Sequence, residues 1–361
     1  IQVVIASPLR QHFDYLPAAG QIAENYPVGS RVQVPFGRRN MTGVVIGHSA
    51  LSTIAADKLK TIKQSLDSFA LLNHDMLALG RWMSQYYHHP LGDTVLNLLP
   101  NTLRKGGLYD AYTQQYWQIT QHGSGLNEEA INRAPKQQSL LNRLREQATN
   151  NDSHAAISEQ QLKAEGHSRP TALALEKKAL ITRSSQGYYP SDCQSLLLGQ
   201  GDDIRPTLNT EQIDANQLID HSLGSFETLL LEGITGSGKT EVYLRAIEKV
   251  LAQQQQAMVL VPEIGLTPQT IQRFVARFSV SIAIFHSGLN DRERLGAWTA
   301  SKEGKASIII GTRSAVFTPT QNLGIIIIDE EHDNSYKQQD GIRYSARDVA
   351  IILAQKQKIP V

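Results

Sequence analysis

The chain has 361 residues, more than one hydrophobic core usually holds, so its length predicts two or three domains. The charges of its 35 basic and 34 acidic residues nearly cancel, so the chain has no large net charge that would attract it to nucleic acid or to a membrane surface. A single cysteine, Cys193, excludes an internal disulfide and a four-cysteine zinc site. No apolar run approaches the ~18 residues of a membrane helix, so we expect a soluble, cytoplasmic protein. The chain begins at Ile1, and we expect it to be a piece of a longer protein.

Residues 1–107 predict a small β-rich domain. Short apolar stretches at residues 3–6, 13–16, 31–36, 42–47 and 59–62 alternate with proline and glycine, as in a small barrel or sandwich. Residues 73–88 predict a helix that Asn73 caps and Pro90 stops. His88 and His89 are adjacent and no third ligand lies nearby, so we expect a packed or solvated pair rather than a metal site.

Residues 108–190 predict a second domain. Gly106, Gly107 and the polar residues 121–132 indicate a boundary and a linker. Helices are predicted at residues 135–147, 158–165 and 169–178, followed by a hairpin of residues 180–183 and 187–189. Three compact helices and a hairpin make a winged helix, which binds DNA grooves or docks proteins.

Residues 191–361 predict an α/β domain. Apolar runs at residues 228–231, 257–261, 281–285, 307–310 and 323–328 are typical of buried parallel strands. Polar motifs follow these strands at residues 236–240, 262–263, 286–287, 311–314 and 329–332. Because ligands of open parallel sheets bind at the carboxyl ends of the strands, the motifs predict one site region.

The strongest motif is a phosphate-binding loop, G-x-x-x-x-G-K-[ST], between a predicted strand and a helix. Its backbone N–H groups cradle phosphates, its lysine reaches the outer phosphates and its hydroxyl can ligate Mg²⁺. The predicted nucleotide-binding residues are Gly233, Gly236, Ser237, Gly238, Lys239, Thr240 and Glu241. Upstream, Gln212 could read the adenine edge through its amide, or it could belong to a capped helix start.

The acidic motif at residues 329–332 predicts the second half of this site. We expect Asp329 to hold Mg²⁺ together with Thr240, and Glu330 to orient and deprotonate the attacking water. The predicted catalytic residues are therefore Lys239, Asp329 and Glu330. His332 would sense the γ-phosphate, although it could also be a plain loop histidine.

Two further segments predict contact with a nucleic-acid strand. Thr312, Arg313 and Ser314 offer hydroxyls and a guanidinium that suit a phosphate backbone without base selectivity. Residues 333–347 interleave aromatic rings with cations and amides, which single strands favour; a solvated surface loop is the alternative. The candidate residues there are Tyr336, Lys337, Gln338, Arg343 and Tyr344.

Residues 236–243 (GSGKTEVY), 329–332 (DEEH) and 335–339 (SYKQQ) resemble the PriA family of primosomal replication-restart helicases. Residues 13–15, 35–37, 59–60 and 86–90 add to the resemblance. The resemblance implies a multidomain protein with a β-barrel-like 3′-end-binding domain, a winged helix and a RecA-like first helicase lobe, whose second lobe is absent here. It implies that Phe13, Asp14, Gly37 and Lys60 hold the terminal base and free 3′-hydroxyl of a nascent strand. It also implies that residues 336–344 couple DNA binding to ATP hydrolysis, although Ile342 stands where the family often has tryptophan.

The resemblance implies an ATP-dependent 3′→5′ DNA helicase that recognises stalled forks and initiates primosome assembly. Its cofactors would be ATP and Mg²⁺, with zinc in the intact protein only. Its partners would be forked and single-stranded DNA with a free 3′ end, single-stranded-DNA-binding protein, and primosome proteins such as PriB and DnaT. We expect this chain alone to hydrolyse little ATP. Two alternatives remain open: a fork-DNA-binding module without catalysis, and a P-loop ATPase that acts on a partner other than nucleic acid.

Overall fold

The computed structural model describes residues 1–52, 54–110, 113–125, 134–150, 156–187, 196–199, 205–234 and 236–361. The chain forms two compact units, one of Ile1–Ala111 with Ser191–Val361 and the other of Tyr112–Pro190. The predicted linker at residues 121–132 is wrong in its first part, because a helix covers residues 121–125; its remainder lies outside the described residues. The domain boundaries after residues 107 and 190 stay predictions.

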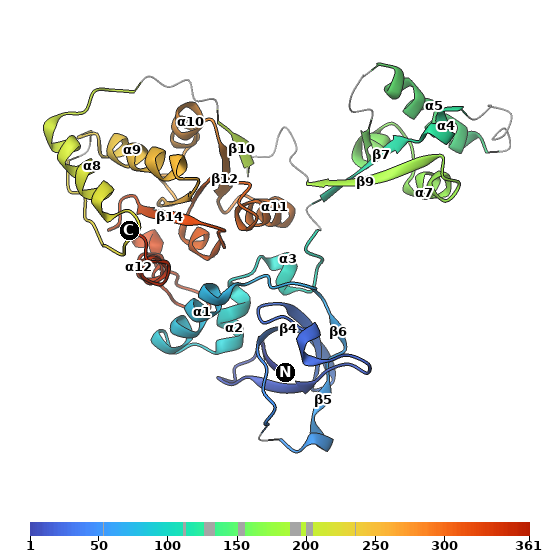
Figure 1. Ribbon diagram of the computed structural model, residues 1–361, viewed down its shortest axis with the longest axis horizontal. Coiled ribbons are helices and arrows are strands. Elements are labelled where there is room, and N and C mark those ends of the chain that lie inside the picture. The colour runs from blue at the N-terminus through green and yellow to red at the C-terminus, as the bar shows by residue number, and fades with distance from the viewer. Residues whose placement is uncertain are drawn as a thin grey trace. The chain divides into compact units, whose positions relative to one another are not determined.

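The N-terminal part of the first unit is a curled, six-stranded sheet (Figure 1). Its strands follow the order β5-β2-β1-β4-β3-β6. The segment of residues 60–65 pairs with β2 through β5 and with β3 through β6, so it joins both edges of the sheet. The elements are β1 (Gln2–Ile5), β2 (Phe13–Leu16), η1 (Ala23–Asn25), β3 (Arg31–Phe36), β4 (Arg39–Gly47), η2 (Ala56–Lys58), β5 (Lys60–Thr61) and β6 (Gln64–Ser65).

A buried ion pair ties this sheet to the chain that follows it. The side chain of Arg31 is fully buried, and its Nη2 and Nε lie 2.8 and 2.9 Å from the two carboxylate oxygens of Asp67. Its Nη1 donates to the carbonyl oxygens of Leu103 at 2.7 Å and Gly107 at 2.8 Å. The guanidinium therefore has acceptors on several sides, which compensates for its loss of water.

Three short helices complete this part: α1 (His74–Tyr86), α2 (Leu91–Asn97) and α3 (Asn101–Arg104). As predicted, Asn73 caps α1, and its Oδ1 accepts a hydrogen bond from the Met76 amide at 2.9 Å. The His89 Nε2 lies 2.5 Å from Asp93 Oδ2. Among the described residues, no group of three or more histidines, cysteines and carboxylates is arranged to hold a metal.

The second unit is a three-stranded sheet, order β8-β7-β9, packed against helices. The three predicted helices form, but the predicted hairpin is wrong. Residues 181–187 form one strand whose antiparallel partner is β7, well upstream in the chain; residues 188–189 lie outside the described part. The elements are β7 (Thr113–Ile119), α4 (Gln121–Gly125), α5 (Pro135–Asn150), β8 (Ile157–Ser158), α6 (Glu159–Ala164), α7 (Arg169–Lys177) and β9 (Ile181–Gly187).

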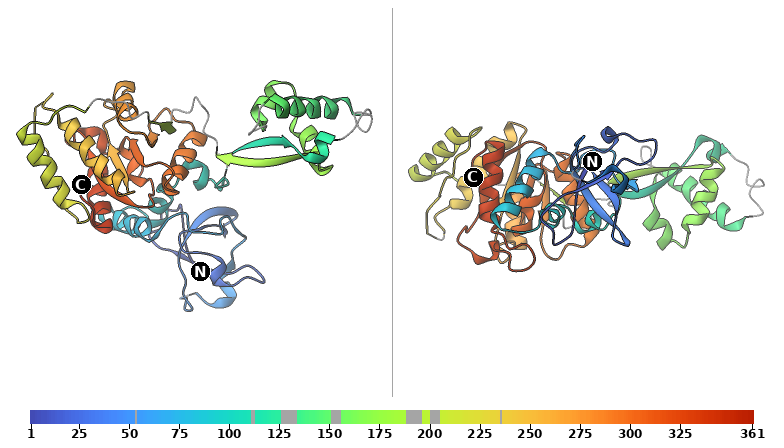
Figure 2. Two further views of the ribbon diagram at one scale, coloured as in Figure 1. Left: turned by 45° about the horizontal axis from the view of Figure 1, so that its top comes forward. Right: turned by 90° about the horizontal axis from the view of Figure 1, so that it is seen from below.

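The α/β part of the first unit has a five-stranded sheet of order β10-β12-β13-β11-β14, with helices on both faces (Figures 1 and 2). Strands β12, β13, β11 and β14 are parallel, and the edge strand β10 is antiparallel and was not predicted. The elements are β10 (Leu196–Leu198), α8 (Thr210–Ser222), α9 (Lys239–Ala252), β11 (Gln256–Leu260), α10 (Pro268–Arg277), β12 (Ser281–Phe285), α11 (Asp291–Lys302), β13 (Ile308–Gly311), η4 (Arg313–Phe317), β14 (Leu323–Ile328), η5 (Asn334–Tyr336) and α12 (Ala346–Gln357).

The sheet follows the predicted apolar runs, except at residues 228–231, where the predicted strand is wrong. The Leu229 amide donates to the Val361 carbonyl oxygen at 2.8 Å, and the Ile326 amide of β14 donates to the Pro360 carbonyl oxygen at 3.1 Å. Residues 360–361 therefore lie between this segment and β14. The Val361 amide also donates to the Glu227 carbonyl oxygen at 2.9 Å, but no strand forms at residues 228–231, and Leu230 is 73% exposed.

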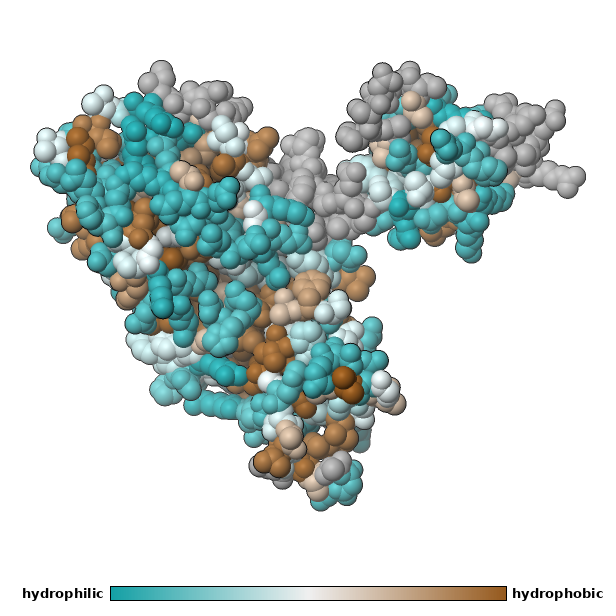
Figure 3. Space-filling view, in the orientation of Figure 1, coloured by the Kyte–Doolittle hydropathy of each residue, from teal (hydrophilic) through white to brown (hydrophobic). Residues whose placement is uncertain are grey.

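Hydrophilic residues cover most of the α/β surface seen in the space-filling view (Figure 3). No helix among the described residues is long and apolar enough to cross a bilayer.

Candidate nucleotide and nucleic-acid sites

The phosphate loop enters helix α9 through two glycines with left-handed backbone. Gly236 has a φ of +82°, and Gly238, at the N-terminus of α9, has a φ of +84°. A Cβ atom on Gly238 would lie 2.4 Å from Gln212 Nε2, and one on Gly233 would lie 2.5 Å from Ser237 Oγ. The left-handed backbone of Gly236 and Gly238 favours glycine at both positions, and the start of the helix presents N–H groups that suit a phosphate.

Lys239 folds back over the loop that precedes it. Its Nζ donates to the carbonyl oxygen of Gly233 at 2.5 Å and lies 3.3 Å from that of Ile234. These neutral carbonyls hold the ammonium at the start of α9. A phosphate oxygen would be a stronger, charged acceptor for the same group.

The hydroxyl of Tyr243 lies 3.5 Å from Oδ2 of Asp329, one of the two candidate Mg²⁺ ligands. Tyr243 stands on α9 three residues after Thr240, the other candidate ligand. Burial, followed by the negative charge of Asp329, raises the pKa of Tyr243 to about 12, so its hydroxyl stays protonated at neutral pH. Sequence reasoning missed Tyr243, although its spacing from Thr240 places both on one face of a helix.

Asp329 follows directly after β14. Its amide donates to the Leu260 carbonyl oxygen at 2.9 Å, and its Oδ1 accepts from the Glu330 amide at 3.1 Å. Burial, then the charge of Glu330, raises the pKa of Asp329, while the charge of Lys239 opposes this. Glu330 has a left-handed φ of +47°, and its exposed carboxylate lies 3.8 Å from His332 Nε2. The turn thus places the partly buried carboxylate of Asp329 beside the exposed carboxylate of Glu330.

A cavity of about 520 Å³ adjoins these groups. It is lined by Lys239, Asp329 and Glu330 and by apolar side chains of residues 228–231, β14 and α8. The polar lining combines a lysine at a helix N-terminus with hard oxygen ligands, so the residues present fit a nucleotide phosphate with Mg²⁺.

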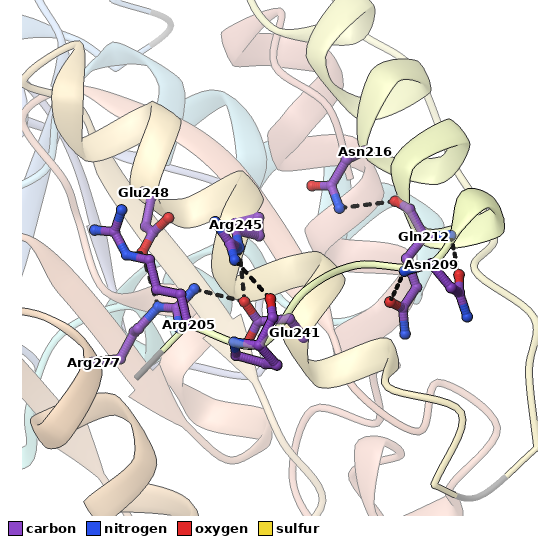
Figure 4. A network of polar contacts seen from close by, with 9 residues as sticks. Arg205, Asn209, Gln212, Asn216, Glu241, Arg245, Glu248 and Arg277 are labelled. Atoms are coloured by element: carbon purple, nitrogen blue, oxygen red, sulfur yellow. Dashed lines mark hydrogen bonds and ion pairs between the residues drawn. The ribbon is translucent and has the colours of Figure 1, made fainter. Parts of the chain in front are cut away.

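Gln212 belongs to a capped helix start (Figure 4), and its side chain also touches the phosphate loop. The Asn209 amide donates to Gln212 Oε1 at 3.0 Å, and the Gln212 amide donates to Asn209 Oδ1 at 2.8 Å. Its Nε2 donates to the Ser237 carbonyl oxygen at 3.0 Å. Because both ends of the amide are engaged, adenine recognition by Gln212 stays a prediction.

Glu241 belongs to an ion-pair network between α9 and α10 (Figure 4). Its Oε1 accepts from Arg245 Nε and from Arg277 Nη2, each at 2.7 Å, and Arg277 Nε donates to Glu248 at 2.8 Å. The side chain of Arg277 is only 1% exposed, so these carboxylates compensate for a buried charge. The contacts of Glu241 do not support its predicted place in the nucleotide site.

The aromatic rings in residues 333–347 are buried, so the expectation of open stacking faces is wrong for this conformation. Tyr336 is 2% exposed and Tyr344 is 6% exposed. The Tyr336 hydroxyl lies 2.6 Å from the Asp329 carbonyl oxygen and 3.0 Å from that of Leu260. The ring therefore packs behind the acidic motif instead of facing solvent.

Arg313 supports this turn from the neighbouring motif. Its Nη1 donates to the carbonyl oxygens of Ser335 at 3.2 Å and Lys337 at 2.8 Å. Of the other candidate strand contacts, Thr312 is buried and Gln338 half-buried, while Ser314, His332, Lys337 and Arg343 are exposed. The exposed members offer cations and a hydroxyl to a partner.

The N-terminal candidates lie close to one another along the barrel strands. Phe13 packs edge-on against Phe36, with ring centroids 5.1 Å apart, and Gly37 follows in the β3–β4 turn. Lys60 is exposed and pairs in register with Tyr15. Side chains alternate along a strand, so Phe13 and Asp14 face opposite sides of β2.

Asp14 has one satisfied and one unsatisfied carboxylate oxygen. Its Oδ2 accepts from Ser52 Oγ at 2.6 Å. Its Oδ1 is buried, lies 3.8 Å from His12 Nε2, and has no hydrogen-bond partner among the described residues. A carboxylate oxygen in this state favours a hydroxyl donor and disfavours an anion.

Comparison with known proteins identifies relatives along the chain. Residues 2–100 match the PriA 3′DNA-binding domain (3′BD), and residues 213–360 match the DEAD/DEAH box helicase family. The replication restart protein PriA of Haemophilus influenzae is 41% identical over 100% of this chain and 48% of its own length. Those of Bacillus subtilis and Chlamydia trachomatis are 31% and 34% identical over 92% and 97% of this chain, and 48% and 46% of their own lengths. This chain, which spans about half the length of these relatives, belongs to the PriA family of replication restart proteins.

Proposed function

We propose that the full-length protein is an ATP-dependent 3′→5′ DNA helicase that recognises stalled or abandoned replication forks and initiates primosome assembly. The observation that supports this best is that Lys239 of the phosphate loop and Asp329 and Glu330 of the acidic motif line one cavity, with the Tyr243 hydroxyl of α9 lying 3.5 Å from Asp329 Oδ2. It brings the two halves of a nucleotide site together in a chain that also has a 3′DNA-binding domain.

In the proposed mechanism, ATP supplies the free energy for strand separation. Lys239 would exchange its loop carbonyls for the outer phosphates, and Thr240 and Asp329 would hold Mg²⁺. Glu330, on the exposed side of the turn, would accept a proton from the attacking water. His332, 3.8 Å from Glu330, would respond to the γ-phosphate.

Substitution of Lys239 tests this assignment. In the full-length protein, Lys239→Ala should lower the ATPase rate by at least about a hundredfold, because one transition-state contact contributes roughly 3 kcal/mol. DNA affinity should change little, since the end-binding residues lie in the barrel. ATPase and filter-binding assays measure the two properties, and equal loss of both would contradict separate sites.

We further propose that Phe13, Asp14, Gly37 and Lys60 bind the 3′ end of a nascent strand. The unsatisfied Asp14 Oδ1 would accept from the free 3′-hydroxyl and repel a 3′-phosphate. Fluorescence anisotropy with one oligonucleotide bearing either end should show tighter binding of the hydroxyl end. Asp14→Ala should erase the preference and Asp57→Ala should retain it; equal binding of both ends by the wild type would refute the pocket.

The second unit would serve as a winged helix, supported by helices α5, α6 and α7 and its antiparallel sheet. The partners of the full-length protein would be forked DNA, single-stranded-DNA-binding protein, PriB and DnaT, and acting on chromosomal DNA it would work in the cytoplasm. Zinc would belong to parts of the full-length protein outside this chain.

A further inference from the structure

Helix α1 of the barrel part carries a pair of stacked aromatic rings near its end. The ring centroids of Trp82 and Tyr86 lie 4.8 Å apart at an interplanar angle of 16°. Tyr87 is nearly perpendicular to both rings, and its centroid lies 4.9 Å from that of Tyr86 and 5.9 Å from that of Trp82. Because Tyr87 is close to both rings, it lies beside the pair. It therefore does not cover the face of Tyr86 that points away from Trp82.

Tyr86 is the member of this cluster that solvent reaches. It is 59% exposed, and its hydroxyl forms no hydrogen bond within the part of the chain that the structure describes. Tyr87, in contrast, is half-buried, and its hydroxyl accepts from the Ser345 amide. The far face of Tyr86 is thus open to a ligand, while Trp82 already holds the ring in one orientation. A ring that is fixed in advance loses little freedom when it binds.

A guanidinium lies next to the end of the same helix. Arg10 is exposed, and its Nη2 donates to the carbonyl oxygen of His88, shortly after Tyr86. Among the described residues, no carboxylate forms an ion pair with Arg10. Asp93, which follows in α2, is engaged by His89 at 2.5 Å. The charge of Arg10 is therefore available to an anion.

His88 adds to this surface at a cost to the fold. It is exposed and has a left-handed φ of +52°, at a position after a helix where glycine is usual. The chain thus keeps an imidazole at the surface where a glycine would be less strained. An open aromatic face beside an unpaired guanidinium and an imidazole suits a nucleobase and its phosphate.

The position of Arg10 links this surface to the candidate 3′-end residues. Arg10 stands three residues before Phe13 at the start of β2, so their Cα atoms lie no more than about 11 Å apart. A strand held at its 3′ end would therefore pass close to Arg10 within a few nucleotides. This continuity favours the DNA strand over an acidic peptide as the occupant.

We propose that Tyr86 stacks on one base of the strand whose 3′ end the barrel holds, and that Arg10 contacts the adjoining phosphate. The inference rests on the proposed function, because it takes that strand as the ligand. The base, Tyr86 and Trp82 then form three successive layers. Every base has an aromatic face, so this contact fixes the path of the strand without selecting its sequence.

The test uses the whole chain and labelled oligodeoxynucleotides with a free 3′-hydroxyl, in which one abasic sugar replaces each nucleotide near the 3′ end in turn. In anisotropy titrations the wild type should bind about tenfold more weakly when the abasic sugar falls at one position upstream of the terminal nucleotide. Tyr86→Leu keeps an apolar side chain but removes the aromatic plane. It should bind the unmodified strand about tenfold more weakly and should not distinguish it from the strand that is abasic at that position.

Tyr86→Phe is the matched control, because it keeps the plane and should bind as the wild type does. 2-Aminopurine at the stacked position gives a second readout, since its fluorescence falls when the base stacks. Saturating wild type or Tyr86→Phe should quench it, and saturating Tyr86→Leu should not.

The phosphate contact is tested through its salt dependence. Arg10→Ala should weaken binding of the unmodified and the abasic strand by the same factor, and it should lower the slope of log affinity against log salt by about 0.7, the value of one phosphate. Arg10→Lys keeps the charge and should restore the slope. Lys356→Ala removes an exposed cation in the last turn of α12 and should change neither quantity.

Wild-type affinity in Tyr86→Leu would overturn the inference, and so would an equal loss for the unmodified and the abasic strand. An unchanged salt slope in Arg10→Ala would overturn the phosphate contact. If these failures occur while the wild type still prefers a 3′-hydroxyl to a 3′-phosphate end, the proposed end site stands and this inference alone is wrong. If the wild type binds both ends alike, the end site is wrong, and loss of base-dependent affinity in Tyr86→Leu would still support stacking on Tyr86.

Discussion

Asp329 combines a candidate functional role with an energetic cost to the folded chain. Burial and the neighbouring Glu330 raise its pKa, so the folded state binds a proton more tightly than the unfolded state does. Stability from this group is therefore greatest when the carboxyl is protonated and falls as the pH rises through its folded-state pKa. At neutral pH the charged Asp329 destabilises the fold in the absence of a cation.

Asp329→Asn should accordingly raise the Tm of the nucleotide-free chain at pH 7.5 by a small amount, because the amide removes the buried charge and its repulsion by Glu330. The same variant should lose Mg²⁺-dependent nucleotide binding, since the amide is a weaker ligand for the cation. Thermal unfolding and titration with a fluorescent nucleotide measure the two effects. A lower Tm would show that Asp329 stabilises the fold, contrary to this account.

Among the elements, the barrel depends most clearly on one buried pair. Arg31 and Asp67 link β3 to the segment after β6, and the same guanidinium donates to Leu103 in α3 and to Gly107 beyond it. Asp67→Ala leaves a buried cation with backbone acceptors only. We expect it to lower the free energy of unfolding of the first unit by about 3 to 5 kcal/mol. Asp57→Ala, at an exposed position, should change it by no more than about 0.5 kcal/mol; urea denaturation compares the two, and equal effects would contradict the prediction.

The elements that the sequence predicts correctly are those with local signals. The capping residue Asn73 and the glycines before α9 mark helix starts, and the apolar runs of β11 to β14 mark buried strands. The errors concern long-range pairing. Residues 228–231 are as apolar as a strand, but Leu229 hydrogen-bonds to Val361 and the segment does not pair along the length of a neighbouring strand. Strand β9 pairs with β7, which lies far upstream in the chain, and not with the residues that follow it. Local composition does not specify which segment supplies the neighbour.

The candidate sites also divide into features with a local sequence signal and features that depend on long-range packing. The phosphate loop and the acidic motif were predicted because their chemistry needs fixed residues at fixed spacing. The contact of Tyr243 with Asp329 was not predicted, because it depends on which face of helix α9 meets the end of β14. The burial of Tyr336 and Tyr344 was not predicted either, because it depends on which face of a loop packs against the sheet. In a sequence, an aromatic residue beside a cation is equally consistent with stacking on DNA and with packing in the core.

Across the whole first unit, a series of contacts connects the barrel part to the acidic motif. The Ser345 amide, at the N-terminus of α12, donates to the Tyr87 hydroxyl at the end of α1 at 3.2 Å. Ser345 also bridges to Lys337, and Tyr336 next to it touches the Asp329 carbonyl oxygen. The two ends of the series are the candidate DNA-end domain and the candidate Mg²⁺ ligand. Contact alone does not establish coupling, which requires a measured interaction between the sites.

Tyr87→Phe tests this coupling in the full-length protein, because it removes the hydroxyl and keeps the ring. We expect the ATPase rate without DNA, and the affinity for 3′-hydroxyl ends, to stay within about twofold of the wild type, since neither site loses a ligand contact. Stimulation of ATP hydrolysis by such DNA should fall about fivefold, because the loop would no longer be fixed to α1. Tyr86→Phe, whose side chain is 59% exposed, is the matched control and should retain full stimulation. If Tyr87→Phe retains the wild-type stimulation, the barrel influences the ATP site by another route. If both variants lose stimulation equally, the aromatic cluster of α1 is responsible and not the hydrogen bond to Ser345.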